Sequence, residues 1–283
     1  MRMLKGYAFI IAAACCWGLI GIFSKVAFNQ GMGPMETAFW RAVIAWLFFA
    51  AQAFATRQTG MEKKDLPLLM AFGLLGISLF YVAYQVAVKT GGAAFASVLL
   101  YTAPAWVVAC SFFIYREALS RFKILSVVLV ILGVFLISRA GSGGTVSIGW
   151  VAVVSGLTSG FCYSLYYTMG KYFSRKYTSA NLFLWLFPVG ALGILPFVTF
   201  VHKTPVAWAS LVGVSFISTF LANACYYQGL RHLEAGRASI VATLEPVVAA
   251  AMAFAFFGEC FSLWGYAGAA LILAAVAATI YDR

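Results

Sequence analysis

The sequence predicts an all-α polytopic membrane protein, with ten transmembrane helices arranged as two inverted five-helix repeats around a central cavity. Three observations support this prediction. The 283 residues are 64% hydrophobic and only 10% charged, whereas a soluble domain carries about 25% charged residues. Several landmarks occur twice at a nearly constant displacement, and lysine and arginine collect in alternate loops.

The repeat is clearest around two prolines. Ser97, Pro104, Glu117 and Ser120 are followed 142 positions later by Ser239, Pro246, Glu259 and Ser262. Tyr84-Gln85 and Tyr227-Gln228 are 143 positions apart, and the stretches 16–25 and 162–171 match at 146. We therefore divide the chain into a first repeat, 1–140, and a second, inverted repeat, 141–283, which together form one integrated domain.

Apolar stretches of about twenty residues, the length that spans a bilayer, follow one another with short polar loops between them. The expected helices span 6–27, 36–55, 66–88, 93–114, 120–138, 148–170, 181–201, 208–229, 238–257 and 262–281. The first stretch could also be a cleaved secretory signal. We interpret it as a retained helix, because Cys16-Trp17 has the repeat counterpart Cys162-Tyr163.

The distribution of lysine and arginine sets the predicted orientation. With the amino terminus in the cytoplasm, fourteen of these residues fall in cytoplasmic loops and ends, and three (Lys89, Arg139 and Lys203) fall outside. Cytoplasmic loops of membrane proteins are enriched in both residue types. We expect both termini to be cytoplasmic, and we attribute the net charge of +11 to this bias rather than to nucleic acid binding.

Pro104 and Pro246 lie near the middle of the fourth and ninth helices. Each removes a backbone donor and displaces the carbonyl four residues earlier, and in hydrocarbon that carbonyl needs a partner or a water-lined cavity. Two interpretations remain open, a packing kink and a kink that turns carbonyl oxygens toward a cavity. Glu245, just before Pro246, has the repeat counterpart Ala103.

A carboxylate deep in a membrane is costly unless it is paired, hydrated or protonated. We therefore expect Glu245 to line a cavity or hold a structural hydrogen bond. Proton or cation coupling and a shallow, solvated position are the alternatives. Lys25, Glu36 and Arg41 lie toward the outer ends of the first two helices, and we expect them to form an interfacial or gate ion pair.

Aromatic and polar side chains in the middle of helices indicate the cavity lining. A buried tyrosine needs a partner for its hydroxyl, which favours the bundle interior over lipid. Such a lining suits a bulky, partly apolar, zwitterionic or cationic solute, and it lacks the clustered cations that phosphate groups require. The expected solute-binding residues are Trp17, Tyr81, Tyr84, Gln85, Tyr101, Pro104, Tyr163, Tyr167, Asn223, Tyr227, Ser239, Thr243, Glu245 and Pro246.

The stretch Leu244-Glu245-Pro246-Val247, followed by an apolar helix and Gly258-Glu259, resembles the second-repeat signature of the EamA-type drug/metabolite transporters. Thr102-Ala103-Pro104 and Arg41 match the corresponding first-repeat positions. The resemblance implies ten helices, with the fifth and tenth peripheral, and export of amino acids and other metabolites. The aromatic lining is most similar to the YddG-type exporters of aromatic amino acids.

We therefore expect a multi-pass transporter of the bacterial inner membrane that exports amino acids, aromatic or bulky and apolar, and related metabolites by alternating access. The alternative is a proton-coupled multidrug exporter of aromatic cations. No nucleophile–base set of a hydrolase is present, and none of the six cysteines has metal-ligand spacing. We expect no enzymatic activity, no cofactor, no metal and no nucleic acid partner. A lipid-scrambling protein is a further possibility, and a monomer is sufficient.

Overall fold

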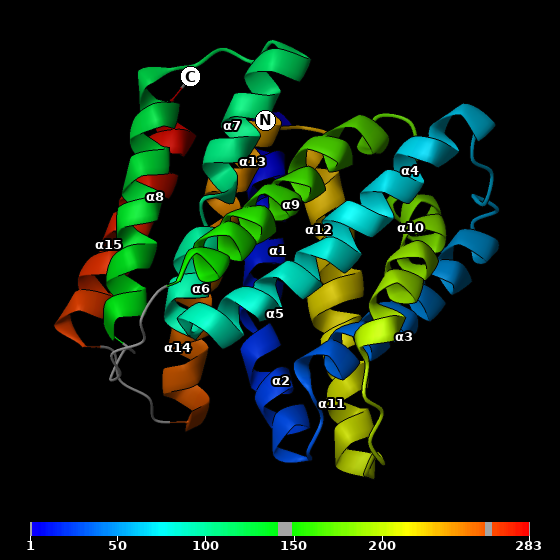
Figure 1. Cartoon of the computed structure of the whole chain (residues 1–283). Helices are drawn as coiled ribbons and strands as arrows, with labels where there is room; N and C mark the ends of the chain where they lie inside the picture. The colour runs from blue at the N-terminus through cyan, green and yellow to red at the C-terminus, as the bar shows by residue number, and fades with distance from the viewer. Residues whose placement is uncertain (1, 141–148, 258–261, 283) are drawn as a thin grey trace.

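The computed structural model describes residues 2–140, 149–257 and 262–282, and helices account for nearly all regular structure in these ranges (Figure 1). The repeat landmark Glu259, the start of the sixth expected helix at residue 148 and the terminal cation Arg283 lie outside the described residues. The first half contains α1 Arg2–Gly18, α2 Ile20–Asn29, α3 Pro34–Ala55, η1 Lys63–Asp65, α4 Leu66–Gly73, η2 Leu74–Leu79, α5 Phe80–Gly91, α6 Ala93–Leu100, α7 Ala103–Tyr115 and α8 Arg121–Ala140. The second half contains α9 Trp150–Ser174, α10 Ser179–Ile194, η3 Leu195–Phe197, α11 Pro205–Ser215, η4 Phe216–Leu221, α12 Ala222–Leu230, α13 Ala235–Ala242, α14 Glu245–Phe257 and α15 Leu263–Tyr281.

The helices match the length of a membrane span. Eight helical stretches within the described residues are long and apolar enough to cross a bilayer. The 20-residue α8 and the 25-residue α9 complete the expected ten. The expected helix 181–201 is shorter than predicted, because α10 ends at Ile194 and η3 ends at Phe197. Pro196 within η3 cannot donate the hydrogen bond that would continue an α-helix.

The two halves interlock in corresponding ways. Helix α1 contacts α12 and α14 of the second half, and α9 contacts α5 and α7 of the first half. Helix α3 lies against α10, while α8 and α15 form a separate pair at one side of the bundle (Figure 1). Gly133 and Gly268 bring the backbones of that pair into direct contact, because a Cβ at either position would meet the other's carbonyl oxygen.

Both helices that contain a mid-membrane proline are interrupted just before it. Helices α6 and α7 are separated at Tyr101 and Thr102, and α13 and α14 at Thr243 and Leu244. Each proline then stands in the first turn of the following helix, where a missing N–H costs nothing. At each break, a threonine hydroxyl hydrogen-bonds to a carbonyl of the preceding helical turn. Thr102 donates to Leu99 O at 2.7 Å, and Thr243 donates to Ile240 O at 2.5 Å.

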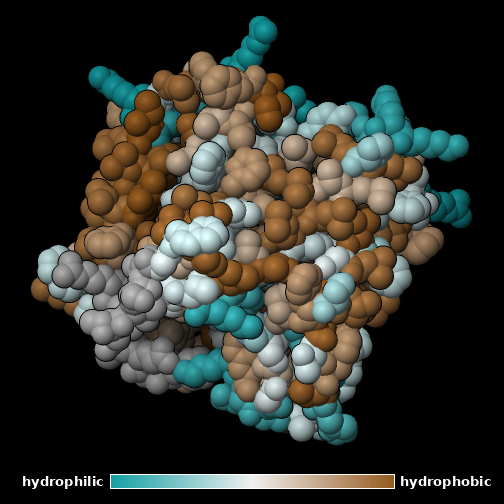
Figure 2. All heavy atoms as spheres, viewed as in Figure 1, coloured by the Kyte–Doolittle hydropathy of each residue, from teal (hydrophilic) through white to brown (hydrophobic). Residues whose placement is uncertain are grey.

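The surface and the interior are both apolar, as a membrane environment requires. Figure 2 shows hydrophobic side chains over the middle of the visible face and hydrophilic ones toward its upper and lower margins. Large exposed side chains such as Phe113, Leu192 and Leu263 belong to this outer surface. Inside, Phe49 stacks on Phe183 with ring centroids 4.7 Å apart, joining α3 to α10.

We call the end at which α1 begins and α15 ends the terminal end, and the opposite end the distal end. The two terminal helices meet there, since the Tyr7 hydroxyl donates to Thr279 O at 3.1 Å. Their meeting agrees with an even number of crossings.

Candidate functional site

A cavity of about 260 Å³ lies between the two halves of the bundle. It is bordered by α1, α2, α3, α5, α6, α9, α12 and α14, so eight helices and both halves contribute to it. The lining side chains are Trp17, Ile20, Arg41, Phe80, Tyr81, Tyr84, Ser97, Leu100, Tyr101, Tyr163, Tyr166, Asn223 and Glu245.

Glu245 places a carboxylate in this cavity because the break before α14 puts it in the first turn, at the helix N-terminus. The Tyr163 hydroxyl donates to Glu245 Oε2 at 3.4 Å, and the Tyr167 hydroxyl donates to Tyr163 at 3.2 Å. Tyr101 faces the same carboxylate from the break in the first half. Two tyrosines and a helix N-terminus, which favours negative charge, therefore hold this carboxylate in place.

Arg41 places a cation in the same cavity from helix α3. Its Nε donates to Thr219 Oγ1 at 2.6 Å, and its Nη2 donates to Ser218 O at 3.4 Å. Arg41 and Glu245 line the cavity from different helices, and no ion pair joins them in the described part of the chain. A solute in this cavity therefore meets one donor of fixed positive charge and one acceptor of potential negative charge.

Asn223 adds a neutral acceptor. Its side chain lines the cavity and its Nδ2 donates to Thr219 O at 2.8 Å. Its buried Oδ1 has no hydrogen-bond partner among the described residues. Buried polar atoms are nearly always satisfied, so this oxygen is an unused acceptor at the edge of the cavity.

Aromatic rings form one wall of the cavity. Phe80 stacks on Tyr163 with centroids 5.5 Å apart, and its ring lies 4.9 Å from that of Tyr81. Tyr84 shares a hydrogen bond of 3.3 Å with Ser97. Aromatic rings beside charged groups suit a solute that has an apolar part and an ionised part.

Seven of the expected solute-binding residues line this cavity: Trp17, Tyr81, Tyr84, Tyr101, Tyr163, Asn223 and Glu245. The other seven do not line it. Tyr167 lies behind Tyr163, and Tyr227 is buried beside Phe183, with ring centroids 5.1 Å apart. Gln85 is half-buried on α5 and is not part of the lining.

The remaining four expected residues shape the backbone instead. Pro104 and Pro246 define the helix breaks, while Ser239 and Thr243 hydrogen-bond to carbonyls three residues earlier in their own helix turn. A mid-helix hydroxyl commonly satisfies itself in this way. Spacing on a helix therefore selected segments near the cavity but did not determine the face that each side chain takes.

Sequence reasoning missed Ile20, Phe80, Ser97, Leu100 and Tyr166 as lining residues. Ser97 was a repeat landmark and Tyr166 a mid-helix tyrosine, so both carried a usable signal. The apolar members carried none, because apolar side chains fill every span of this chain.

A second cavity of similar size, about 280 Å³, lies between α3 and α10. Its lining is apolar: Phe39, Val43, Trp46, Phe187, Pro188, Ala191, Leu192 and Leu195. The indole N–H of Trp46 is already used, donating to Leu184 O at 2.9 Å. Ligand sites combine apolar walls with a few convergent polar groups, so the central cavity is the better candidate.

Of the ion pair expected among Lys25, Glu36 and Arg41, the structure gives Glu36 a different partner. Glu36, at the distal end of α3, pairs with Lys203 at 2.5 Å and accepts the Val201 N–H at 3.2 Å. Residues five positions apart on a helix point about 140° apart, so Glu36 and Arg41 face different neighbours. Lys25 lies half-buried in α2 and has an interaction of its own.

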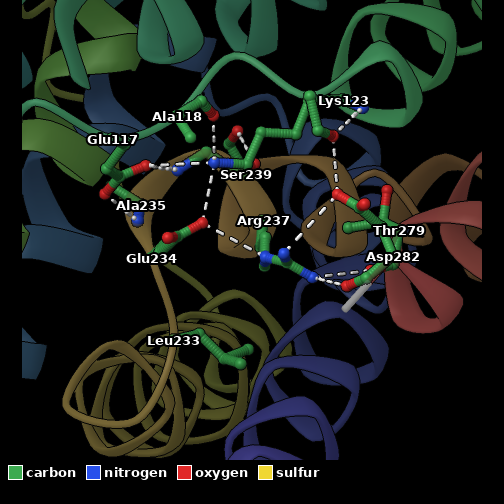
Figure 3. Close-up of polar contacts among 12 residues, drawn as sticks. Glu117, Ala118, Lys123, Leu233, Glu234, Ala235, Arg237, Ser239, Thr279 and Asp282 are labelled. Carbon is green, nitrogen blue, oxygen red and sulfur yellow. Dashed lines mark hydrogen bonds and ion pairs between the residues drawn. The ribbon is translucent and has the colours of Figure 1, made fainter. Parts of the chain in front are cut away.

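At the terminal end, a network of charged residues joins the two halves (Figure 3). Glu117, just after α7, accepts the backbone N–H groups of Ala235 and Gly236 at 3.0 and 3.3 Å, and so caps the first turn of α13. Lys123, whose side chain is 3% exposed, pairs with Glu234 at 2.7 Å. A side chain of the first half therefore caps a helix of the second half.

Arg237 continues this network toward the carboxyl end of the chain. Its guanidinium lies 3.1 Å from Glu234 and 3.5 Å from the Asp282 carboxylate, which accepts the Ser120 hydroxyl at 2.6 Å. Partial burial by itself raises the pKa of Glu234, but hydrogen bonds and charge from Lys123 and Arg237 outweigh it and hold that pKa below its ordinary value. Glu234 is therefore ionised at neutral pH.

Comparison with known sequences assigns a family to this arrangement. The sequence profile of the EamA-like transporter family matches residues 4–139 and again residues 150–281. The chain belongs to the EamA-like transporter family. The double match means that each half of the chain carries the family's sequence pattern, in agreement with the repeat read from the landmarks.

Relatives of this EamA-like transporter cover nearly its whole length. A protein described as an uncharacterized transporter from Archaeoglobus fulgidus is 25% identical over 274 residues, which are 97% of this chain and 96% of that protein. The uncharacterized inner membrane transporter YicL from Salmonella typhimurium is 25% identical over 282 residues, covering 96% of this chain and 94% of that one. A solved crystal structure shares the fold, with a TM-score of 0.84 over 96% of this chain and 15% identity.

Membership of the EamA-like family makes the chain a multi-pass membrane transporter and not an enzyme. Its substrate is therefore a small molecule that crosses the bilayer in which the helices lie. In the described part of the chain, the central cavity brings charged and aromatic side chains together.

Proposed function

We propose that this transporter exports amino acids with aromatic or bulky apolar side chains, and related small metabolites, by alternating access. The observation that carries the proposal is the coexistence of Arg41, Glu245 and an aromatic wall in one cavity. A zwitterionic amino acid has a carboxylate for the guanidinium, an ammonium group for the carboxylate, and a side chain for the rings. Asn223 supplies a second acceptor for the ammonium group.

The cavity size supports a small solute. Its volume of about 260 Å³ lies below the roughly 300–1,000 Å³ typical of pockets for drug-sized ligands. We further propose a bacterial inner-membrane location with both termini in the cytoplasm, and a monomer in which the halves 1–140 and 141–283 rock around the cavity as inverted repeats.

A second candidate function is proton-coupled export of aromatic cations. Glu245 favours it, because a carboxylate among tyrosines can bind a planar cation or exchange a proton. Arg41 opposes it, because a fixed cation in the same small cavity repels a cationic solute. For this reason we rank an amino acid above an aromatic cation as the substrate.

The test is counterflow into liposomes that contain the purified protein, with radiolabelled phenylalanine, tryptophan, threonine and a planar aromatic cation, each with and without a pH gradient. Saturable flux of the aromatic amino acids without the gradient supports the proposal. Cation flux that requires the gradient supports the second candidate, and absence of flux for every amino acid contradicts the first. Protein-free liposomes and Arg41→Gln provide the controls, since Arg41→Gln should lower amino acid flux and spare cation flux.

A further inference from the structure

Two of the membrane-spanning helices change from α to π geometry at corresponding places. The π segment η2 spans Leu74–Leu79 between α4 and α5, and η4 spans Phe216–Leu221 between α11 and α12. Their bounds differ by 142 positions, the displacement of the repeat. Short π segments inside α-helices are rare and occur often at functional sites. Their sequences, LLGISL and FISTFL, have little in common, so a shared local sequence does not explain the shared geometry.

A hydroxyl supports each π segment from within. The Ser78 hydroxyl lies 3.4 Å from Gly73 O, and the Thr219 hydroxyl lies 3.1 Å from Val214 O, in each case a carbonyl five residues earlier. This is the register of a π turn, so each hydroxyl takes up a carbonyl that the widened turn presents.

The surroundings of the two segments differ. Segment η2 lies against α10, where Gly190 and Gly193 approach Ile77 and Ser78 so closely that a Cβ would not fit. The Ser78 hydroxyl also reaches Gly190 O at 2.9 Å. These contacts are neutral and tightly packed, and they leave the segment little freedom to change register.

Segment η4 lies against α1 and α3 instead, and Arg41 of α3 hydrogen-bonds to it. The guanidinium donates to the Thr219 hydroxyl at 2.6 Å and to Ser218 O at 3.4 Å. The same guanidinium lines the solute cavity. Asn223, one turn after Thr219, lines the cavity too and donates to Thr219 O at 2.8 Å. One charged residue therefore contacts both the solute space and an irregular helix turn.

We propose that Arg41 couples occupation of the cavity to the conformation of η4. An anionic group of a solute binds the guanidinium from the cavity side and draws it away from Thr219 and Ser218. The π turn is then released and can shift its register as the halves move. A ligand drives such a change only if it binds one conformation better than the other, and the guanidinium provides that difference. The inference rests on the carboxylate of the proposed amino acid substrate.

The test separates the charge of Arg41 from its link to η4. Thr219→Val removes the hydroxyl and leaves the guanidinium in the cavity, whereas Thr219→Ser keeps the hydroxyl. Phenylalanine affinity is measured by equilibrium dialysis and the maximal rate by counterflow. We expect Thr219→Val to keep the affinity within about threefold and to change the maximal rate by about tenfold or more. Thr219→Ser should match the wild type in both.

Hydrogen exchange provides a readout that a merely structural role would not move. In the wild type and in Thr219→Ser, saturating phenylalanine should accelerate exchange of the 216–221 amides; in Thr219→Val these amides should exchange faster without solute and respond little to it. The matched control is Ser78→Ala, which removes the hydroxyl of η2 and should leave the response of η4 intact. A wild-type rate in Thr219→Val, an equal loss of affinity and rate, or η4 exchange that ignores solute in the wild type would overturn the proposal.

Two further measurements test the coupling if Thr219→Val does not fold or if phenylalanine does not bind. If Thr219→Val fails to fold by gel filtration, Arg41→Lys retains the charge and loses the forked donor geometry, and it should show the same separation of affinity from rate. If the wild type binds no amino acid, the proposed substrate fails. The solute-free exchange of η4 in Thr219→Val and Thr219→Ser then still decides whether the Arg41 link restrains the segment, and equal exchange in both would overturn it.

Discussion

The two halves of the molecule share their backbone irregularities but not their polar side chains. Helices α6 and α7 separate before Pro104 just as α13 and α14 separate before Pro246. The π segments η2 and η4 correspond equally well. By contrast, Glu245 of the second half stands where the first half has Ala103, which is completely buried. Arg41 on α3 also has no charged counterpart in the stretch 183–187 of α10.

This difference separates two requirements. A backbone that must adopt two related packings benefits from having the same bends in both halves. A solute with one carboxylate and one ammonium group has no such symmetry, so each charge is needed in one place only. Under the proposed function, the repeat accounts for the bends that the halves share, and the departures from it account for the charges in the cavity.

The largest expected effect concerns the ion pairs that join the halves at the two ends. At the distal end, Lys203 and Glu36 form a single pair, with side chains 8% and 1% exposed. Lys203→Met leaves a buried carboxylate without its cation and should lower the free energy of unfolding by about 3–5 kcal/mol. Lys123→Met at the terminal end should cost less. Its partner Glu234 is 43% exposed and keeps Arg237, and its more distant partner Glu117, at 3.9 Å, keeps two backbone N–H donors.

Both variants would be compared by unfolding in mixed micelles with increasing denaturing detergent. Adding Glu36→Gln to Lys203→Met should recover part of the loss, since the unpaired charge is then gone. The prediction is contradicted if Lys203→Met and Lys123→Met lower the free energy of unfolding equally. It is also contradicted if the double variant is no more stable than Lys203→Met alone.

The next effect tests the asymmetry of the cavity. Glu245→Gln should weaken phenylalanine binding about ten- to hundredfold, the worth of a hydrogen bond to a charged group. No carboxylate of the first half can take its place, because the residue that corresponds to Glu245 there is Ala103. The measurement is equilibrium dialysis with the purified protein. Glu62→Gln neutralises an exposed carboxylate and should leave binding unchanged; unaltered affinity in Glu245→Gln would remove Glu245 from the binding site.

A smaller effect is expected where a side chain of one half hydrogen-bonds to a backbone carbonyl that a proline frees in the other half. Pro188 frees the carbonyl of Leu184 within α10, and Trp46 of α3, 142 positions before Pro188, donates to that carbonyl. Trp46→Phe keeps an aromatic ring, removes the donor and should cost about 1–3 kcal/mol of stability. Trp185→Phe removes a bond from an exposed indole to Thr59 O and should cost little. Equal thermal stability of the two variants would contradict this assignment.

The smallest expected effect is a pH dependence at the terminal end. The pKa of Glu234 is lower in the folded protein than its ordinary value, so its ion pairs stabilise the fold above the ordinary carboxyl pKa of about 4.3. That contribution is lost as the pH falls through the folded-state pKa. The difference in thermal midpoint between the wild type and Glu234→Gln should therefore shrink on acidification. A difference that stays constant with pH would show that Glu234 does not titrate with folding.

The helices were predictable because each had a local signal. Nine of the ten expected spans agree with the described helices to within a few residues, since apolar length and flanking polar residues define them. The exception, 181–201, extended too far because Leu195-Pro196 lies within an apolar stretch that resembles continued helix. The π segments had no signal in the sequence, because side-chain and interhelical contacts decide between α and π geometry there.

The candidate site was predictable only in part, and particular residues show why. Tyr163 and Glu245 were identified because a carboxylate or a tyrosine deep in a membrane needs a polar neighbour. Tyr227 has the same composition signal as Tyr84, yet it points into the packed ring cluster with Phe183. Which face of a helix turns toward the cavity depends on how the helices cross, and a single sequence does not state that.

The sequence by itself predicted a membrane protein with ten long apolar helices in two related halves, because bilayer thickness and repeat displacement act along the chain. Only the tertiary structure decided that Arg41 turns to η4 and the cavity while Glu36 turns to Lys203. Both are charged residues on one helix, and their partners lie more than 160 positions away in the other half. Charges in an apolar interior are stable only beside a partner, and the packing of the helices selects which partner that is.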